Sequence, residues 1–382
     1  LEEDGVEGRM LLRTTHALMA PLAAMSLMAC GAAPAAGPAA DAPPEPPVHY
    51  FPPVDAGGEW ERTSTIEAGL DPAAVAAALS FAREQGSSGV VILFDGRIVA
   101  EERWEVGDPT ARYSRMVTGR TASGHAVEDV ASVQKSVVSF LVGVAEGKGV
   151  LDLDAPVSDY LSAGWSSAPV DKEEAITVEH LLAMTSGLGI DGSYEVPPGE
   201  RWQYNTRMYS KMLGVLEAAT DLSTDDYTRQ WLTEPTGMAD SGWTPRPRVG
   251  NQDANAVGFS TSARDLARFG LMLQRAGRWE SDDLLGNVGY IGRSTSPSQT
   301  LNEAYGYLWW LNGQASGLRA GGQAFSGSYI PSAPDDLYAA AGALGRMLYV
   351  VPSRKLVVTR LGDAPGAGFN PEFWRLLLGG SS

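Results

Sequence analysis

Two residues with complementary chemistry, Ser132 and Lys135, stand three positions apart in the chain. A serine hydroxyl becomes an effective nucleophile when a neighbouring group takes its proton, and a lysine can do so once burial disfavours its ammonium form. Residues three apart share one face of a helix. Among the five lysines, Lys135 alone follows a serine at this spacing. The pair predicts a nucleophilic serine with its own base, although the same tetrad also fits a serine that caps a helix followed by a surface lysine.

A helix is the element that must position this pair. Apolar residues recur at helical spacing over residues 137–144, and Gly147 and Gly149 end the run. The pattern predicts a buried helix with Ser132 in its first turn. The field at a helix start favours negative charge, which helps the serine oxygen to lose its proton. The predicted helix therefore favours the catalytic interpretation.

Other hydrolytic chemistries have fewer candidates. The four histidines are His16, His49, His125 and His180, and no G-x-S-x-G elbow occurs. A Ser-His-Asp triad would need His125 or His180, and His180 lies in an amphipathic run that favours a packed helix histidine. The chain shows neither a His and Cys cluster with metal-ligand spacing nor a phosphate-binding glycine motif. The sequence therefore predicts no metal and no cofactor.

Four segments together resemble the serine β-lactamase-related family, which groups class C β-lactamases, D-alanyl-D-alanine carboxypeptidases, esterases and 6-aminohexanoate-dimer hydrolases. They are DVASVQKSVVSFLVGVAEGKGVLDLDAPVSDYL from Asp129, HLLAMTSGL from His180, PPGERWQY from Pro197 and STSARDLARFGLML from Ser260. The resemblance covers residues 63–363. It implies an α/β plus all-α fold of the β-lactamase and penicillin-binding-protein type, in which an antiparallel sheet is flanked by helices and a helical subdomain, about residues 132–289, is inserted.

The resemblance also implies roles for the first two motifs. Ser132 matches the acylated serine, Lys135 the lysine that helps to deprotonate it, and Tyr204 the tyrosine that relays protons to and from the leaving group. The family's second motif usually reads Tyr-x-Asn, whereas this chain reads Tyr204-Asn205-Thr206. The motif's asparagine is therefore displaced or replaced, and we keep Asn205 as a candidate substrate-binding residue.

The third motif, normally Lys or His, then Thr or Ser, then Gly, aligns with Ala340-Ala341-Gly342. Gly342 would let the backbone approach the substrate, and Ala343 would donate its N–H to the oxyanion beside the N–H of Ser132. The motif's cation and hydroxyl, which ordinarily hold a substrate carboxylate, are absent. This favours a neutral ester or amide over a β-lactam or peptidoglycan stem, unless a cation such as Arg346 replaces the missing one.

The N-terminal segment predicts export. Residues 10–29 have a positively charged start, an apolar stretch and the ending LMAC at Cys30, which predicts a signal peptide. The ending resembles a lipoprotein signal, which implies lipidation of Cys30; an ordinary signal cleaved near Ala33 or Ala36 is the alternative. Residues 1–9 are interpreted as an extension of uncertain origin. We therefore expect a protein of the bacterial cell envelope, in the periplasm, anchored to a membrane through Cys30.

Composition restricts the partners. Residues 30–57 are dense in Pro and Ala, which predicts an extended tether. The net charge of -17 disfavours nucleic acid and direct contact with an anionic bilayer. Cys30 is the single cysteine, so no intrachain disulfide is possible. The expected partner is a small ester or amide, and the residues predict no oligomeric state.

Residues 58–382 are expected to form one catalytic domain. Asp71-Pro72 predicts the start of a helix that runs to Gly86, and Asp95-Gly96 predicts a hairpin turn between two strands. YGYLWWL, RMLYVVP and KLVVTRL read as strands and FNPEFWRLLL as a closing helix. Aromatic residues near the motifs are candidates for a cleft, with strand core packing favoured for the last two: Trp202, Tyr305, Tyr307, Trp309 and Trp310.

We therefore predict a serine hydrolase that forms an acyl-enzyme with a neutral ester or amide. Two alternatives stay open. A penicillin-recognising binding protein, or a β-lactamase or DD-peptidase acting on peptidoglycan-like substrates, would keep Ser132. A non-catalytic envelope lipoprotein scaffold would have no need for Ser132, Lys135 and Tyr204 together.

Overall fold

The computed structural model describes residues 49–55, 58–246, 256–287 and 289–380. The predicted signal peptide, Cys30 and most of the predicted tether lie outside these residues. Residues 48–382 belong to one compact unit. Within the described ranges, no helix is both long and apolar enough to cross a membrane.

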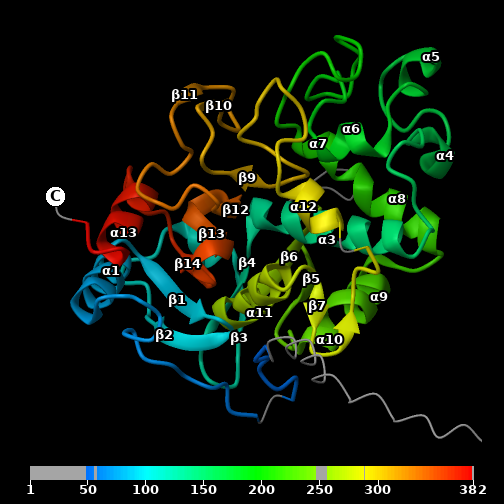
Figure 1. Ribbon diagram of the computed structural model, residues 1–382. Coiled ribbons are helices and arrows are strands. Elements are labelled where there is room, and N and C mark those ends of the chain that lie inside the picture. The colour runs from blue at the N-terminus through cyan, green and yellow to red at the C-terminus, as the bar shows by residue number, and fades with distance from the viewer. Residues whose placement is uncertain (1–48, 56–57, 247–255, 288, 381–382) are drawn as a thin grey trace, which may run out of the picture. The chain divides into compact units, whose positions relative to one another are not determined.

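A six-stranded antiparallel sheet is built from both ends of this unit, in the order β2-β1-β14-β13-β12-β9 (Figure 1). The predicted hairpin is confirmed: Asp95 and Gly96 connect β1 to β2 with φ angles of 47° and 88°. Positive φ angles at both turn residues match the twist of the paired strands. The strands are β1 (Ser87–Phe94), β2 (Arg97–Arg103), β9 (Trp310–Leu311), β12 (Tyr338–Gly342), β13 (Arg346–Val351) and β14 (Leu356–Gly362).

Helices cover the two faces of this sheet. On β13, Tyr349 packs against Trp374 of α13 (Phe369–Leu377), with ring centroids 5.5 Å apart, and α1 (Pro72–Glu84) lies beside α13. The neighbouring Leu348 points to the other face, where it meets Gly270 of α11 (Ala263–Gln274). A Cβ on Gly270 would come within 2.7 Å of Leu348 Cδ1, so glycine allows α11 to approach the sheet closely.

A smaller sheet runs in the order β3-β4-β6-β5 and joins the large sheet to the helical region. It consists of β3 (Val117–Arg120), β4 (Ala126–Asp129), β5 (Gly242–Pro245) and β6 (Val257–Ser262). Its last two strands and α11 fall inside the predicted helical subdomain, about residues 132–289. That boundary is too broad, because α11 buries its apolar face against the large sheet instead of against other helices.

The predicted strand YGYLWWL is also shorter than expected, since β9 spans Trp310–Leu311 alone. Leu308 has a φ angle of 65°, which ends extended backbone. Its carbonyl accepts a hydrogen bond from Ser136 Oγ at 2.8 Å and its N–H donates to Leu182 O at 3.1 Å. Tertiary contacts with the helical region thus replace strand pairing at this point.

The buried helix α3 (Gln134–Gly147) packs against α8 (Lys211–Thr220) and α12 (Gly289–Ser294), and the other helices of the insert follow in the chain. They are α4 (Ser158–Leu161), α5 (Val170–Glu173), α6 (Val178–Leu182), α7 (Thr206–Tyr209), α9 (Thr224–Thr228) and α10 (Glu234–Thr236). The remaining short elements are α2 (Ala111–Ser114), the strand pair β7 (Arg278–Trp279) and β8 (Asp282–Asp283), and the pair β10 (Ser316–Leu318) and β11 (Ala324–Ser326).

Candidate active site

Ser132 lies in a short 3₁₀ turn, Ala131–Val133, that leads directly into α3, so it precedes the α-helix instead of occupying its first turn. Neither the turn nor the helix uses the serine hydroxyl as a cap. Lys135, in the first turn of α3, directs Nζ to Ser132 Oγ at 3.1 Å. The alternative of a capping serine and a surface lysine is therefore wrong, because Lys135 is 2 % exposed.

The surroundings of Lys135 favour its neutral form. Burial, together with the positive charge of Arg246, lowers the pKa of Lys135 to about 7. Its Nζ lies over the rings of Tyr204 and Tyr209, 4.9 and 4.6 Å from their centroids. The described residues offer no carboxylate in ion-pair contact with it. An amine that is half neutral near pH 7 and in contact with a serine hydroxyl can serve as its general base.

Tyr204 completes the group that the sequence analysis placed together. Burial raises the pKa of its phenol, and the interaction with the Ser132 side chain partly opposes this rise. Its ring is packed among aromatic side chains and stacks on Trp310 with centroids 5.8 Å apart. The five aromatic residues do not form the expected cleft at Ser132. All of them are buried in the core and none lines the cavity: Trp202, Tyr305, Tyr307, Trp309 and Trp310.

Asn205 does not take the predicted substrate-binding position. Its amide donates to the carbonyls of Leu188 and Gly189 at 3.2 and 2.9 Å, and its Oδ1 accepts from the N–H of Met208 at 3.2 Å. These bonds use the amide group to cap α7, and the side chain does not line the cavity. Thr206 lines it instead. The position of the motif's asparagine is thus occupied by Thr206.

The predicted third motif lies against the serine turn. A Cβ on Gly342 would come within 2.4 Å of Val130 O and 3.3 Å of Ser132 N, so a side chain there would collide with the turn. Ala343 lines the same cavity as Ser132. Leu344, which follows, has a φ angle of 62°, and Ala131, before Ser132, has a φ angle of 51°. Left-handed backbone is strained for such residues and is frequent at functional sites.

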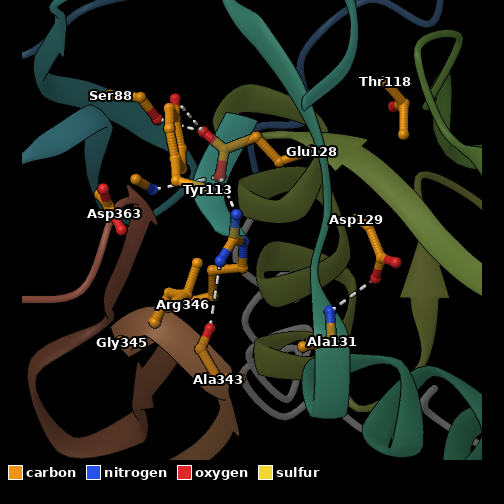
Figure 2. Close-up of polar contacts among 12 residues, drawn as sticks. Ser88, Tyr113, Thr118, Glu128, Asp129, Ala131, Ala343, Gly345, Arg346 and Asp363 are labelled. Atoms are coloured by element: carbon orange, nitrogen blue, oxygen red, sulfur yellow. Dashed lines mark hydrogen bonds and ion pairs between the residues drawn. The ribbon is translucent and has the colours of Figure 1, made fainter. Parts of the chain in front are cut away.

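A buried ion pair, Glu128 with Arg346, holds the backbone at Ala343, the residue that lines the cavity beside Ser132 (Figure 2). Arg346 NH2 lies 2.9 Å from Glu128 Oε2, and both side chains are fully buried. Arg346 also donates to the carbonyl of Ala343 at 3.2 Å. Glu128 accepts hydrogen bonds from Ser88 Oγ and from Tyr113 OH, the latter at 3.1 Å. The possibility that Arg346 replaces the missing cation of the third motif is therefore wrong, because Arg346 is absent from the cavity lining and paired with Glu128.

The cavity at Ser132 has a volume of about 650 Å³. Lys135, Thr206 and Ala343 line it with Ser132, and so do residues that the sequence analysis missed: Arg112, Arg115, Thr118, Asp129, Thr244 and Arg246. Asp129 Oδ1 accepts from Ala131 N at 2.9 Å and thus ties the serine turn to Arg246. The sequence did offer one signal for this cavity, the spacing of Arg112 and Arg115 three positions apart in an acidic chain. That spacing does not reveal which surface the two side chains reach.

The histidines have structural roles in the described ranges. His180, predicted as a packed helix histidine, accepts the N–H of Thr177 at its Nδ1, 3.1 Å away, and so closes the capping box of α6. His125 is buried, and its Nε2 lies 3.6 Å from Glu101 Oε1. In the described part of the chain, no group of three or more His, Cys, Asp and Glu side chains is arranged to hold a metal ion.

The pKa of Lys135 predicts the pH dependence of catalysis. Because Lys135 accepts a proton in its neutral form and its pKa is about 7, kcat/KM should rise between about pH 5.5 and about pH 8.5 with a midpoint near pH 7. Arg246→Gln removes a like charge beside Lys135 and leaves Asp129 unpaired, and both changes favour the ammonium form. The rising limb should therefore move to higher pH, as measured with a p-nitrophenyl ester.

Arg264→Gln is the matched control. Arg264 also pairs with a carboxylate, Glu101, but does not line the cavity. Its loss should leave the midpoint unchanged. A midpoint that is unaffected by Arg246→Gln, or that moves to lower pH, would show that another group titrates.

Sequence comparison shows which known proteins this chain resembles. Residues 70–376 match the model of the Beta-lactamase family. An uncharacterized protein of Alkalihalophilus pseudofirmus is 24% identical over 309 residues, which cover 74% of this chain and 86% of the relative. Penicillin-binding protein 4* of Bacillus subtilis is 23% identical over 175 residues, 38% of this chain and 37% of that protein.

Solved structures share the fold at low sequence identity. A Bacillus anthracis protein named as a candidate 6-aminohexanoate-dimer hydrolase has a TM-score of 0.62 and 13% identity, covering 86% of this chain and 88% of its own. A β-lactamase from Mycobacterium bovis has a TM-score of 0.56 and 17% identity, covering 79% and 97%. The family model spans most of the chain, and these structures confirm the predicted fold. The chain therefore belongs to the Beta-lactamase family.

Proposed function

We propose that this chain is a serine hydrolase that acts on an ester or amide through an acyl-enzyme at Ser132. The observation that carries the proposal is the 3.1 Å contact between Lys135 Nζ and Ser132 Oγ, made by a buried lysine whose pKa is lowered to about 7. The family match supports hydrolysis as the reaction class. The names of similar proteins, a hydrolase, a β-lactamase and a penicillin-binding protein, suggest which substrate classes to test.

In the proposed reaction, the Lys135 amine takes the Ser132 proton while Oγ bonds to the substrate carbonyl carbon. The carbonyl oxygen becomes negative and accepts hydrogen bonds from the N–H groups of Ser132 and Ala343. The proton on Lys135 then passes through Tyr204 to the leaving alcohol or amine as the bond from that group to the carbonyl carbon breaks. Water attacks the acyl-enzyme carbonyl carbon and gives a proton to the same two residues, which return it to Ser132 Oγ as the acyl bond breaks, so the acid and free Ser132 are released.

Labelling followed by turnover separates this function from its rivals. A fluorophosphonate should label Ser132, and a p-nitrophenyl ester should be hydrolysed over many turnovers. Labelling without turnover supports a penicillin-recognising binding protein, for which the lost groups of the second and third motifs are the favouring observation. Neither labelling nor turnover supports a non-catalytic scaffold.

Substrate choice follows from the third motif. Ala340 and Ala341 cannot supply the cation and hydroxyl that hold a carboxylate beside the scissile bond, and such a charge-assisted bond contributes roughly 1.5–3 kcal/mol. We therefore expect kcat/KM for short p-nitrophenyl esters to exceed that for nitrocefin by at least about tenfold, or ~1.4 kcal/mol. Side-by-side kinetics on the purified protein measure this ratio. An equal or higher value for nitrocefin would contradict the assignment.

We also propose that the protein is exported and lipid-anchored through Cys30, as its LMAC ending favours. Cys30→Ser should then move the protein from the membrane fraction to the soluble fraction, because the acyl chains that provide membrane affinity cannot be attached. Immunoblots of salt-washed fractions from cells expressing each form measure this. A variant that stays with the membrane after the wash contradicts lipid anchoring at Cys30.

A further inference from the structure

The cavity at Ser132 is rich in arginine although the chain carries a net charge of -17. Arg112, Arg115 and Arg246 all line it. Asp129 is the carboxylate among the lining residues, and Arg246 engages both of its oxygens, with Nε at 2.5 Å and NH2 at 2.7 Å. This bidentate ion pair compensates the negative charge of Asp129. Lys135 is partly neutral near pH 7, so Arg112 and Arg115 carry most of the positive charge that remains.

Arg112 and Arg115 lie in and just after α2 and are exposed to solvent. In the part of the chain that the structure describes, neither guanidinium forms an ion pair or a hydrogen bond with another side chain. Two guanidinium groups on one cavity wall attract an anion and match the two oxygens of a carboxylate. Their field acts locally against the acidic charge of the whole chain.

The segment that carries these arginines is held by buried contacts. Thr110, the cap of α2, donates from its N–H and Oγ1 to Asp363 at 2.6 and 2.9 Å. Tyr113, between the two arginines, donates from its hydroxyl to the buried Glu128 at 3.1 Å (Figure 2). The backbone of α2 is thus fixed to the same Glu128–Arg346 pair that holds the carbonyl of Ala343 at the cavity. Binding an anion at these side chains requires no ordering of the backbone, which favours affinity.

We propose that the cavity binds a substrate whose reacting carbonyl lies at Ser132 and whose carboxylate, remote from the scissile bond, is held by Arg112 and Arg115. The reaction part rests on the proposed function, whereas the carboxylate site does not. This site uses α2, not the third motif on β12, so it is compatible with the absence of a cation at Ala340 and Ala341. The inference narrows the substrate from an ester or amide in general to one that carries a carboxylate remote from the scissile bond, in place of the neutral substrate that the sequence predicted.

Two esters of equal length test the charge. The mono-p-nitrophenyl ester of glutarate keeps a terminal carboxylate, and p-nitrophenyl methyl glutarate has that carboxylate capped. We expect the full-length protein to hydrolyse the anionic ester with a kcat/KM at least about fivefold higher at low salt. This preference should shrink as ionic strength rises, because salt screens charges at an open cavity. A preference for the capped ester, or none, overturns the proposal.

The variant Arg112→Gln/Arg115→Gln tests the residues. It should lower the ratio of the two kcat/KM values at least about tenfold. The control Arg83→Gln/Arg354→Gln removes two exposed arginines that do not line the cavity and should leave the ratio unchanged. Circular dichroism verifies the fold of both variants. If the control lowers the ratio as much, general charge accounts for it and the assignment to α2 is wrong.

Binding keeps the carboxylate site testable if no ester is hydrolysed. Calorimetric titration of Ser132→Ala protein with monomethyl glutarate and with dimethyl glutarate compares a charged and a neutral ligand without turnover. Tighter binding of the charged ligand, lost in the Arg112→Gln/Arg115→Gln background, supports the site even where hydrolysis, and with it the proposed function, fails. Equal binding of both ligands overturns it whatever the turnover results.

Discussion

Ser132→Ala should reduce kcat/KM for a p-nitrophenyl ester by at least about a thousandfold, because it removes the oxygen that forms the acyl-enzyme. The fold should survive. Ser132 caps neither the 3₁₀ turn nor α3, and its hydroxyl accepts a hydrogen bond from Lys135 within the site. Steady-state kinetics and circular dichroism of the purified variant measure the two effects.

Ser136→Ala provides the matched control for Ser132→Ala. Ser136 lies one residue after Lys135 and donates to Leu308 O, away from the cavity. Its loss should affect stability more than turnover. Residual activity above a few per cent in Ser132→Ala would identify another nucleophile, and a fluorophosphonate label that persists in that variant would locate it.

Glu128→Ala should reduce the free energy of unfolding by about 3–5 kcal/mol, since it leaves the buried charge of Arg346 without its partner. The change also deprives Ser88, Tyr113 and the N–H of Gly362 of a common acceptor. Urea unfolding, followed by tryptophan fluorescence, measures the loss. Turnover should fall too, because Arg346 holds the carbonyl of Ala343 at the cavity wall.

Two further variants separate charge from packing. Glu128→Ala/Arg346→Met replaces the pair by apolar groups and should recover much of the stability, as buried ion pairs often contribute little in net terms. Glu372→Ala breaks a partly exposed pair with Arg375 and should cost no more than about 1 kcal/mol. A loss in Glu128→Ala no larger than in Glu372→Ala would contradict a buried, uncompensated charge.

Local patterns in the sequence were sufficient to predict several elements of the structure. Asp71 caps α1 by accepting from the N–H groups of Ala73 and Ala74, and Asp95-Gly96 forms the hairpin turn, because both depend on neighbours within a few residues. The order of the motifs was sufficient to predict the family and its fold, and the family match confirms both. The catalytic roles of Ser132, Lys135 and Tyr204 stay predictions, and the structure places the three together.

Tertiary structure alone decided which side chains share the cavity. Asn205 and Thr206 are adjacent in the sequence, yet the first caps a helix and the second lines the cavity. The reason is that the backbone carbonyls of residues 188 and 189 accept hydrogen bonds from the Asn205 amide. Asp129 and Arg246 are 117 positions apart and form one ion pair.

Burial and charge depend on such long-range neighbours. The lowered pKa of Lys135 arises from packing and from Arg246, neither of which is visible in the spacing that identified Lys135. The same holds for Arg112 and Arg115, which follow no motif and line the same cavity as Ser132 because α2 is anchored to Glu128 and Asp363. The sequence thus determined the family, the local elements and the spacing of Ser132 and Lys135, whereas the fold decided the electrostatics of this pair, because electrostatic energy depends on distance in space and on exclusion of water.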